Sequence, residues 1–172
     1  MTTRRIKLAL VAAALMLVSI AALSVPSSVR AGEESGPGLE GSWVDDVTIV
    51  SGFNAGTTIK NLSTYSQGGG LLTLPAAVPP PLQSSAGHGS WIHTQGHKFS
   101  NTIVNFIYDP TGQLVAVLKI HQNLTLGEQG DEYNGNASFD VFDPAGNPIP
   151  GFSGCSTFLG KRIRVEPPST CP

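Results

Sequence analysis

Asp45 is the residue of this chain whose type and placement best suit acid–base chemistry. On an extended strand it shares a face with Trp43 and Val47. If that face is turned inward, the carboxyl group is polar in an apolar interior, where burial raises its pKa and allows it to act as an acid or base. The alternative is an exposed aspartate beside Asp46, which is the usual environment of this residue type.

Histidines offer a second kind of chemistry, that of a metal site. His93 and His97 flank a predicted turn over residues 94–96, where two imidazoles and a carboxylate could hold a metal ion. The alternative is a pair of solvated histidines beside a turn. Because no tight ligand spacing is present, we predict no metal site and no cofactor, with His93 and His97 as the only candidates.

Motifs for nucleophilic catalysis and phosphate binding are missing from the sequence. No Gly-x-Ser-x-Gly occurs. The three glycines at residues 68–70 do not lead from a strand into a helix, so they do not form a phosphate-binding loop. These motifs therefore do not identify a reaction for the protein.

The amino-terminal segment has the pattern of a secretory signal peptide. A basic start at residues 4–7 precedes an apolar stretch at residues 8–23, and Val29 and Ala31 supply the small side chains of a cleavage site. We predict a signal peptide over residues 1–31 that directs the protein to the periplasm or the medium.

The rest of the 172-residue chain is short enough for a single domain. We expect a flexible lead-in over residues 32–38 and one domain over residues 39–172. Cleavage removes four of the ten Lys/Arg residues (Arg4, Arg5, Lys7 and Arg30) and none of the twelve Asp/Glu residues, so six cations face twelve acids and the net charge is −6. No basic patch remains, so we expect neither a nucleic-acid nor a membrane partner.

Cys155 and Cys171 are the two cysteines of the chain. In an exported protein the default expectation is that they form one disulfide bond. This bond would tie the proline-rich tail to the last predicted strand.

The elements that must position these groups are all predicted strands. Apolar residues do not recur at helical spacing after the signal peptide, whereas alternation and turn residues recur throughout. Asp-Pro-x-Gly turns are predicted at residues 109–112 and 143–146. Eight strands result, over residues 41–50, 57–66, 71–74, 88–94, 98–108, 113–126, 132–142 and 152–166.

Eight antiparallel strands of alternating polarity must cover one face and manage their edges. An up-and-down β-barrel does both, so this all-β architecture is the predicted fold. A β-sandwich is the alternative, because the sequence does not show the order of the strands. In a barrel of this size, aromatic side chains either contact a small ligand or fill the lumen as core. The predicted ligand contacts are Tyr65, Trp91, Phe106, Tyr133 and Phe139.

Gly41-x-Trp43 at the start of the first strand resembles the lipocalins and the wider calycin superfamily of secreted barrels. In those families the tryptophan closes one barrel end, and an arginine near the end of the last strand packs across it. The resemblance implies the same structural role here for Trp43 with Arg162 or Arg164. The second lipocalin motif and the helix after the last strand have no counterpart, so the chain is more similar to the avidin-like members.

Three functions are compatible with these features. The first is a binding module that holds a small apolar ligand in the lumen. The second is a cofactor-free isomerase or cyclase of the allene oxide cyclase type, which needs a carboxylate such as Asp45 within reach of the lumen. The third is a filled barrel that acts through its surface as an inhibitor or interaction module, with residues 75–86 as the place of contact.

Overall fold

The computed structural model describes residues 38–75 and 81–168. The predicted signal peptide, most of the predicted lead-in and Cys171 lie outside the described residues, so the predicted disulfide lies outside them too. Within the described ranges no helix is long and apolar enough to cross a membrane.

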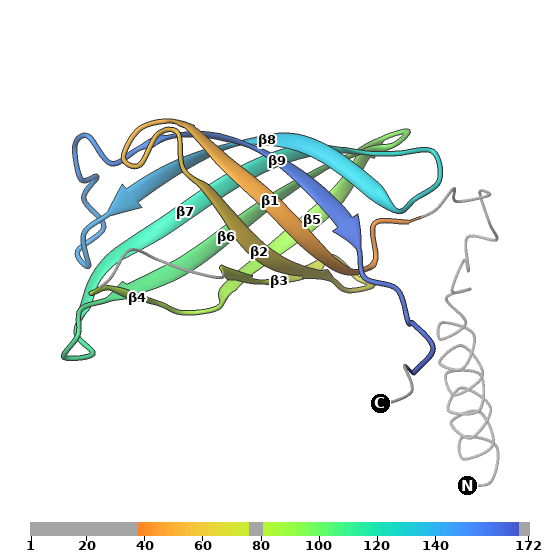
Figure 1. The fold of residues 1–172 in the computed structure, drawn as a ribbon. Coiled ribbons are helices and arrows are strands. Elements are labelled where there is room, and N and C mark those ends of the chain that lie inside the picture. The colour runs from red at the N-terminus through yellow and green to blue at the C-terminus, as the bar shows by residue number, and fades with distance from the viewer. Residues whose placement is uncertain (1–37, 76–80, 169–172) are drawn as a thin grey trace, which may run out of the picture. The chain divides into compact units, whose positions relative to one another are not determined.

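Strands make up almost all of the regular structure (Figure 1). Each predicted strand is present, and one short strand, β4, is additional. The bounds are β1 Gly41–Ser51, β2 Thr58–Tyr65, β3 Gly70–Pro75, β4 Gln83–Ser84, β5 Gly87–Gln95, β6 Lys98–Tyr108, β7 Leu114–Leu126, β8 Glu132–Phe142 and β9 Gly154–Arg162.

The strands close into a ring, which confirms the predicted up-and-down barrel and not the sandwich. Each long strand pairs antiparallel with the next in sequence, from β1 to β9, and β9 pairs back onto β1. Of the strands in the described residues, only β4 stands outside this ring. It pairs with the end of β6 that extends past β5, and thereby satisfies backbone groups that β5 does not reach. Figure 1 shows the ring from the side.

The last strand is shorter than predicted. The sequence predicts a strand over residues 152–166, but β9 ends at Arg162. The reason is the length of the neighbouring strand, because β1 begins at Gly41. The last backbone hydrogen bond to β1 is the one from Ile163 N to Ser42 O (2.8 Å). Beyond that point no strand remains for the chain to pair with.

Trp43 and Arg162 close one end of the barrel. Trp43 is fully buried, its indole nitrogen donates to the carbonyl oxygen of Leu39 at 3.0 Å, and the Arg162 guanidinium lies 4.2 Å from the ring centre. Arg162 also donates to the carbonyl oxygens of Gly130 (2.6 Å), Gly38 (2.7 Å) and Glu40. Arg164 instead pairs with Asp131 at the surface.

Gly41 is required for this closure. Its φ of +123° is one that side-chain-bearing residues rarely adopt, and a Cβ there would lie 2.8 Å from the Arg162 guanidinium. The glycine of Gly-x-Trp therefore makes room for the arginine that covers the tryptophan.

Aromatic side chains fill this closed half of the lumen. The buried cluster includes Tyr65, Trp91, Phe99, Tyr133 and Phe158. Between β8 and β9 the rings lie over glycines that pair with them directly across the strands, Tyr133 over Gly160 and Phe158 over Gly135. A Cβ at either glycine would overlap the ring. The half of the barrel next to Trp43 therefore has no room for a ligand.

Candidate functional site

The other half of the lumen is a cavity of about 430 Å³. It lies toward the barrel end where residues 52–57 and 143–153 connect the strands. Most of its wall consists of aliphatic and aromatic side chains that point inward from β1, β2 and β6 to β8. They include Val47, Ile59, Ile103, Leu118, Ile120 and Phe139.

One side of the cavity is polar. Asn61, Thr73 and Asn105 line it from β2, β3 and β6, which are neighbours around the ring except for β5 between the last two. At that position β5 carries Gly87, and a Cβ on Gly87 would lie 2.8 Å from Asn105 Nδ2 and also overlap the Thr73 hydroxyl. The absent side chain therefore lets the hydroxyl and the carboxamide converge.

Asp45 lies directly behind this polar side and is only 4% exposed. Its Oδ2 accepts hydrogen bonds from the Ser63 hydroxyl (2.5 Å) and from Asn61 Nδ2 (2.9 Å), and its Oδ1 accepts one from the Tyr133 hydroxyl (2.5 Å). The carboxyl is not part of the cavity wall. Asn61 connects the two, since it lines the cavity and contacts the acid.

Burial controls the electrostatics of this cluster. Desolvation raises the pKa of Asp45 above its usual range, against the lowering effect of the hydrogen bonds from Ser63, Tyr133 and Asn61. Burial likewise raises the pKa of both Tyr65 and Tyr133. The phenols therefore stay neutral at physiological pH, and Tyr133 remains a donor to the carboxyl.

A third asparagine faces the lumen deeper in the barrel. Asn101 is 5% exposed, and its Nδ2 lies 3.4 Å from the Tyr65 hydroxyl. Its carboxamide oxygen is the one buried side-chain polar atom with no hydrogen-bond partner among the described residues. An unpaired buried acceptor is costly, but Asn101 does not line the cavity, so this oxygen is not part of the site.

Two phenylalanines flank the cavity mouth. Phe53, in the β1–β2 connection, and Phe152, in the β8–β9 connection, have ring centres 5.1 Å apart, and both line the cavity. They are 54% and 40% exposed. An exposed aromatic pair at the entrance of an apolar cavity provides contact surface for a ligand.

The predicted ligand contacts lie in three different places. Tyr65, Trp91 and Tyr133 belong to the filled half of the lumen, and among the five only Phe139 lines the cavity. The structure corrects the prediction for Phe106, which does not face the lumen. It is 44% exposed on the outer face, because the inward positions of β6 are Phe99, Asn101, Ile103 and Asn105. Two of those inward residues are polar, and the prediction for Phe106 rested on its aromatic type and not on its face of the strand.

The candidate metal ligands are exposed and make other contacts. His93 Nε2 lies 2.6 Å from the carbonyl oxygen of Gly96, and its ring packs against Phe99 with centres 5.0 Å apart. His97 is exposed in the same turn. Across residues 38–75 and 81–168 no group of three or more His, Cys, Asp or Glu side chains is placed to hold a metal ion. Cys155 is exposed on β9.

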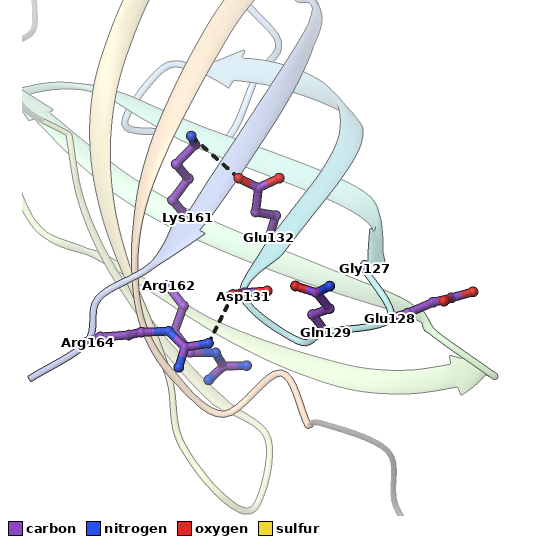
Figure 2. A pocket seen from close by; sticks show the side chains of 8 residues that line it. All are labelled: Gly127, Glu128, Gln129, Asp131, Glu132, Lys161, Arg162 and Arg164. Atoms are coloured by element: carbon purple, nitrogen blue, oxygen red, sulfur yellow. Dashed lines mark hydrogen bonds and ion pairs between the residues drawn. The ribbon is translucent and has the colours of Figure 1, made fainter.

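A second depression lies outside the closed end and is lined by charged side chains (Figure 2). Lys161 pairs with Glu132 at 3.4 Å, Arg164 pairs with Asp131 at 3.0 Å, and Arg162 is committed to covering Trp43. These ion pairs are largely solvated. The depression is therefore a surface of paired charges, whereas the lumen cavity is mainly apolar.

Several residues of the cavity carried no sequence signal. Asn61 and Asn105 stand at strand positions that alternate with apolar residues, so their polarity suggests the outer face. Phe53 falls outside the predicted strands, and Phe152 was assigned to the last strand. Alternation along β1 could not identify Asn61 as a partner of Asp45. The two residues lie opposite each other only because of the register between β1 and β2.

Comparison of the chain with known protein families, with curated proteins and with solved structures finds no match.

Proposed function

We propose that this protein is an exported, calycin-like binding module that holds one small, mainly apolar molecule in the open half of its barrel. The observation that carries the proposal is the cavity of about 430 Å³ at the end opposite Trp43. Its volume falls within the range of roughly 300–1,000 Å³ that is usual for small-molecule sites. Export is supported by the signal-peptide pattern of residues 1–31.

The division of the lumen supports a single small ligand. Packed aromatic side chains occupy the Trp43 half, so a molecule that enters can reach only as far as the level of Asn61 and Ile103. A filled barrel that acts only through its surface would have no need of the cavity or of the exposed Phe53 and Phe152 at its mouth.

The experiment is a binding measurement with a variant whose cavity is blocked. A fluorescent naphthalene probe is titrated into the wild-type protein and into Val141→Trp, which places an indole in the cavity wall. The matched control is Ile92→Trp, because Ile92 is 63% exposed on the outer face. We expect saturable binding by the wild type and the control, with loss of binding in Val141→Trp. Equal binding by all three proteins would place the probe outside the lumen.

A second candidate function is proton transfer to or from the bound molecule, as in a cofactor-free isomerase or cyclase. Asp45 favours it, because a buried carboxyl group with a raised pKa beside a ligand cavity is a common arrangement for an acid or base. Binding alone remains the better supported function, since Asn61 lies between the carboxyl group and the cavity and Asp45 does not line the cavity.

Hydrogen exchange in a bound ketone distinguishes the two functions. If Asp45 transfers protons, deuterium from solvent enters the carbon next to the carbonyl group faster with the wild type than without protein. Asp45→Asn would abolish the acceleration while the ketone still binds. Binding without any acceleration leaves the binding module as the function.

A further inference from the structure

The polar side of the cavity carries information about the ligand beyond its size. No side chain with an ionisable group lines the cavity among the described residues. Asp45 lies just behind the wall. Among the described residues it is the only Asp, Glu, Lys or Arg that is buried. A carboxylate end on a ligand would lose its hydration here, find no cation and lie near an acid.

The hydrogen-bond directions around Asp45 fix what Asn61 offers to the cavity. A carboxylate only accepts hydrogen bonds, so Asn61 must turn its NH₂ group toward it. That nitrogen lies 2.9 Å from both Asp45 Oδ2 and Ser63 Oγ, which are themselves 2.5 Å apart, so the NH₂ group is held on the side of the acid. The group of Asn61 that remains for a ligand is the carboxamide oxygen, an acceptor.

The other two inward asparagines repeat this orientation. Asn105 Nδ2 donates to the carbonyl oxygen of Ser85 at 3.3 Å, and Asn101 Nδ2 faces the Tyr65 hydroxyl at 3.4 Å. In each case the protein engages the nitrogen. The carboxamide oxygen of Asn101 is buried without a partner in the described structure. Of these two only Asn105 lines the cavity, so the carboxamide oxygens of Asn61 and Asn105 are the acceptors that the asparagines offer to a ligand, beside the Thr73 and Ser156 hydroxyls and the Gln122 amide, which can also donate.

We infer that the ligand is a neutral molecule whose polar end is a hydrogen-bond donor, such as an alcohol or a phenol, and that the cavity rejects carboxylates. This inference rests on the proposed lumen binding. The donor reaches the Asn61 oxygen, while the apolar body contacts Ile103, Ile120 and Phe139. Asp45 thus acts as a positioning residue, because it holds Asn61 with its oxygen available.

The test is a matched ligand series on the full-length mature protein, measured by isothermal titration calorimetry. The probes are naphthol, methoxynaphthalene, naphthoate and naphthylmethylammonium, which share one apolar body. Decanol, decyl methyl ether and decanoate repeat the comparison with a flexible body. We expect the hydroxyl compounds to bind roughly fivefold or more tightly than the matched methyl ethers, the equivalent of one net hydrogen bond. The carboxylates should bind more weakly than both.

A variant pair tests the named atom. Asn61→Leu removes the acceptor at similar volume, and the preference for naphthol over methoxynaphthalene should disappear. Thr57→Val at the cavity mouth is the control, and it should keep the preference. The wild-type series decides the inference even if Asn61→Leu fails to fold.

The outcomes separate this inference from the proposed function. Methyl ethers, carboxylates or the ammonium compound that bind as tightly as the hydroxyl compounds would overturn the neutral-donor inference and leave lumen binding intact. No binding by either series, together with no binding by the fluorescent probe, would overturn both.

Discussion

Tyr133 lies over Gly160, its direct cross-strand partner, and from that position its hydroxyl donates a 2.5 Å hydrogen bond to Asp45 Oδ1. The same glycine also pairs with Asp45 across β1 and β9. A residue without a side chain thus stands between an acid and the phenol that binds it. Asp45 and Tyr133 are 88 positions apart in the sequence, and the glycine between them leaves the space in which their side chains meet.

We predict that Gly160→Ala destabilises the protein by about 1–3 kcal/mol, the usual cost of overpacking a well-packed core. A Cβ at this position overlaps the Tyr133 ring, so the ring and its hydrogen bond to Asp45 must shift. Urea unfolding measures the change in free energy. Ser138→Ala on the exposed face of β8 is the control and should change stability by less than about 0.5 kcal/mol. Equal stability of the two variants would show that the ring position is not constrained.

The closed end predicts a large difference between its two arginines. Arg162→Ala should cost about 2 kcal/mol, because it removes the contact with Trp43 and three hydrogen bonds to backbone carbonyl oxygens. Arg164→Ala should cost no more than about 0.5 kcal/mol, since its pair with Asp131 is mostly exposed. Thermal and urea unfolding compare the two, and similar losses would contradict this assignment.

Trp43→Ala should destabilise the protein by about 3–5 kcal/mol, the range for removing a large aromatic side chain from a core. Trp43 is fully buried and packs against Tyr133 with ring centres 4.6 Å apart. Ile92→Ala, at a 63% exposed position, provides the comparison. Urea midpoints of both variants are measured under the same conditions. A Trp43→Ala protein as stable as the wild type would mean that this end of the barrel closes by other contacts.

The raised pKa of Asp45 predicts how stability changes with pH. Because the folded protein holds this proton more tightly than the unfolded chain, the carboxyl contribution becomes less favourable as pH rises from the usual aspartate pKa through the folded-state pKa. The stability of the wild type minus that of Asp45→Asn should therefore fall across this range and then level off. Urea unfolding at a series of pH values gives the difference. A difference that grows with pH would reverse the assigned direction.

The two Asp-Pro-x-Gly turns predict the opposite trend. Asp109 accepts hydrogen bonds from Thr111 and Gln113, and Asp143 accepts them from Asn147 and Ala145, which lowers the pKa of both carboxyl groups. Their contribution is present above the usual aspartate pKa and is lost as pH falls through the lowered values.

The double variant Asp109→Asn/Asp143→Asn should therefore be less stable than the wild type near neutral pH and should approach it in acid. Urea midpoints at both pH values provide the measurement. A deficit that persists unchanged in acid would show that the charge of the two carboxylates is not its cause.

Local patterns determined the strands and their connections. The alternation of residues 132–142 placed Tyr133 and Phe139 inward, and the Asp-Pro-x-Gly runs placed two turns, because both depend on neighbours within a few positions. The prediction for Phe106 rested on its aromatic type alone, and the residue lies on the outer face. On β6 the inward positions include Asn101 and Asn105, so the polarity of each residue taken alone indicates the wrong face.

The sequence by itself determined the all-β class, the turns and the face of Asp45, which alternation assigned to the same side as Trp43 and Val47, but it left the choice between barrel and sandwich open. Only the tertiary structure decided that this face is buried at Asp45 and that one half of the lumen is filled while the other is open. The partners that matter, Asn61, Ser63 and Tyr133, reach Asp45 through strand register and ring closure. Register and closure are properties of pairing between distant segments, and no local pattern encodes them.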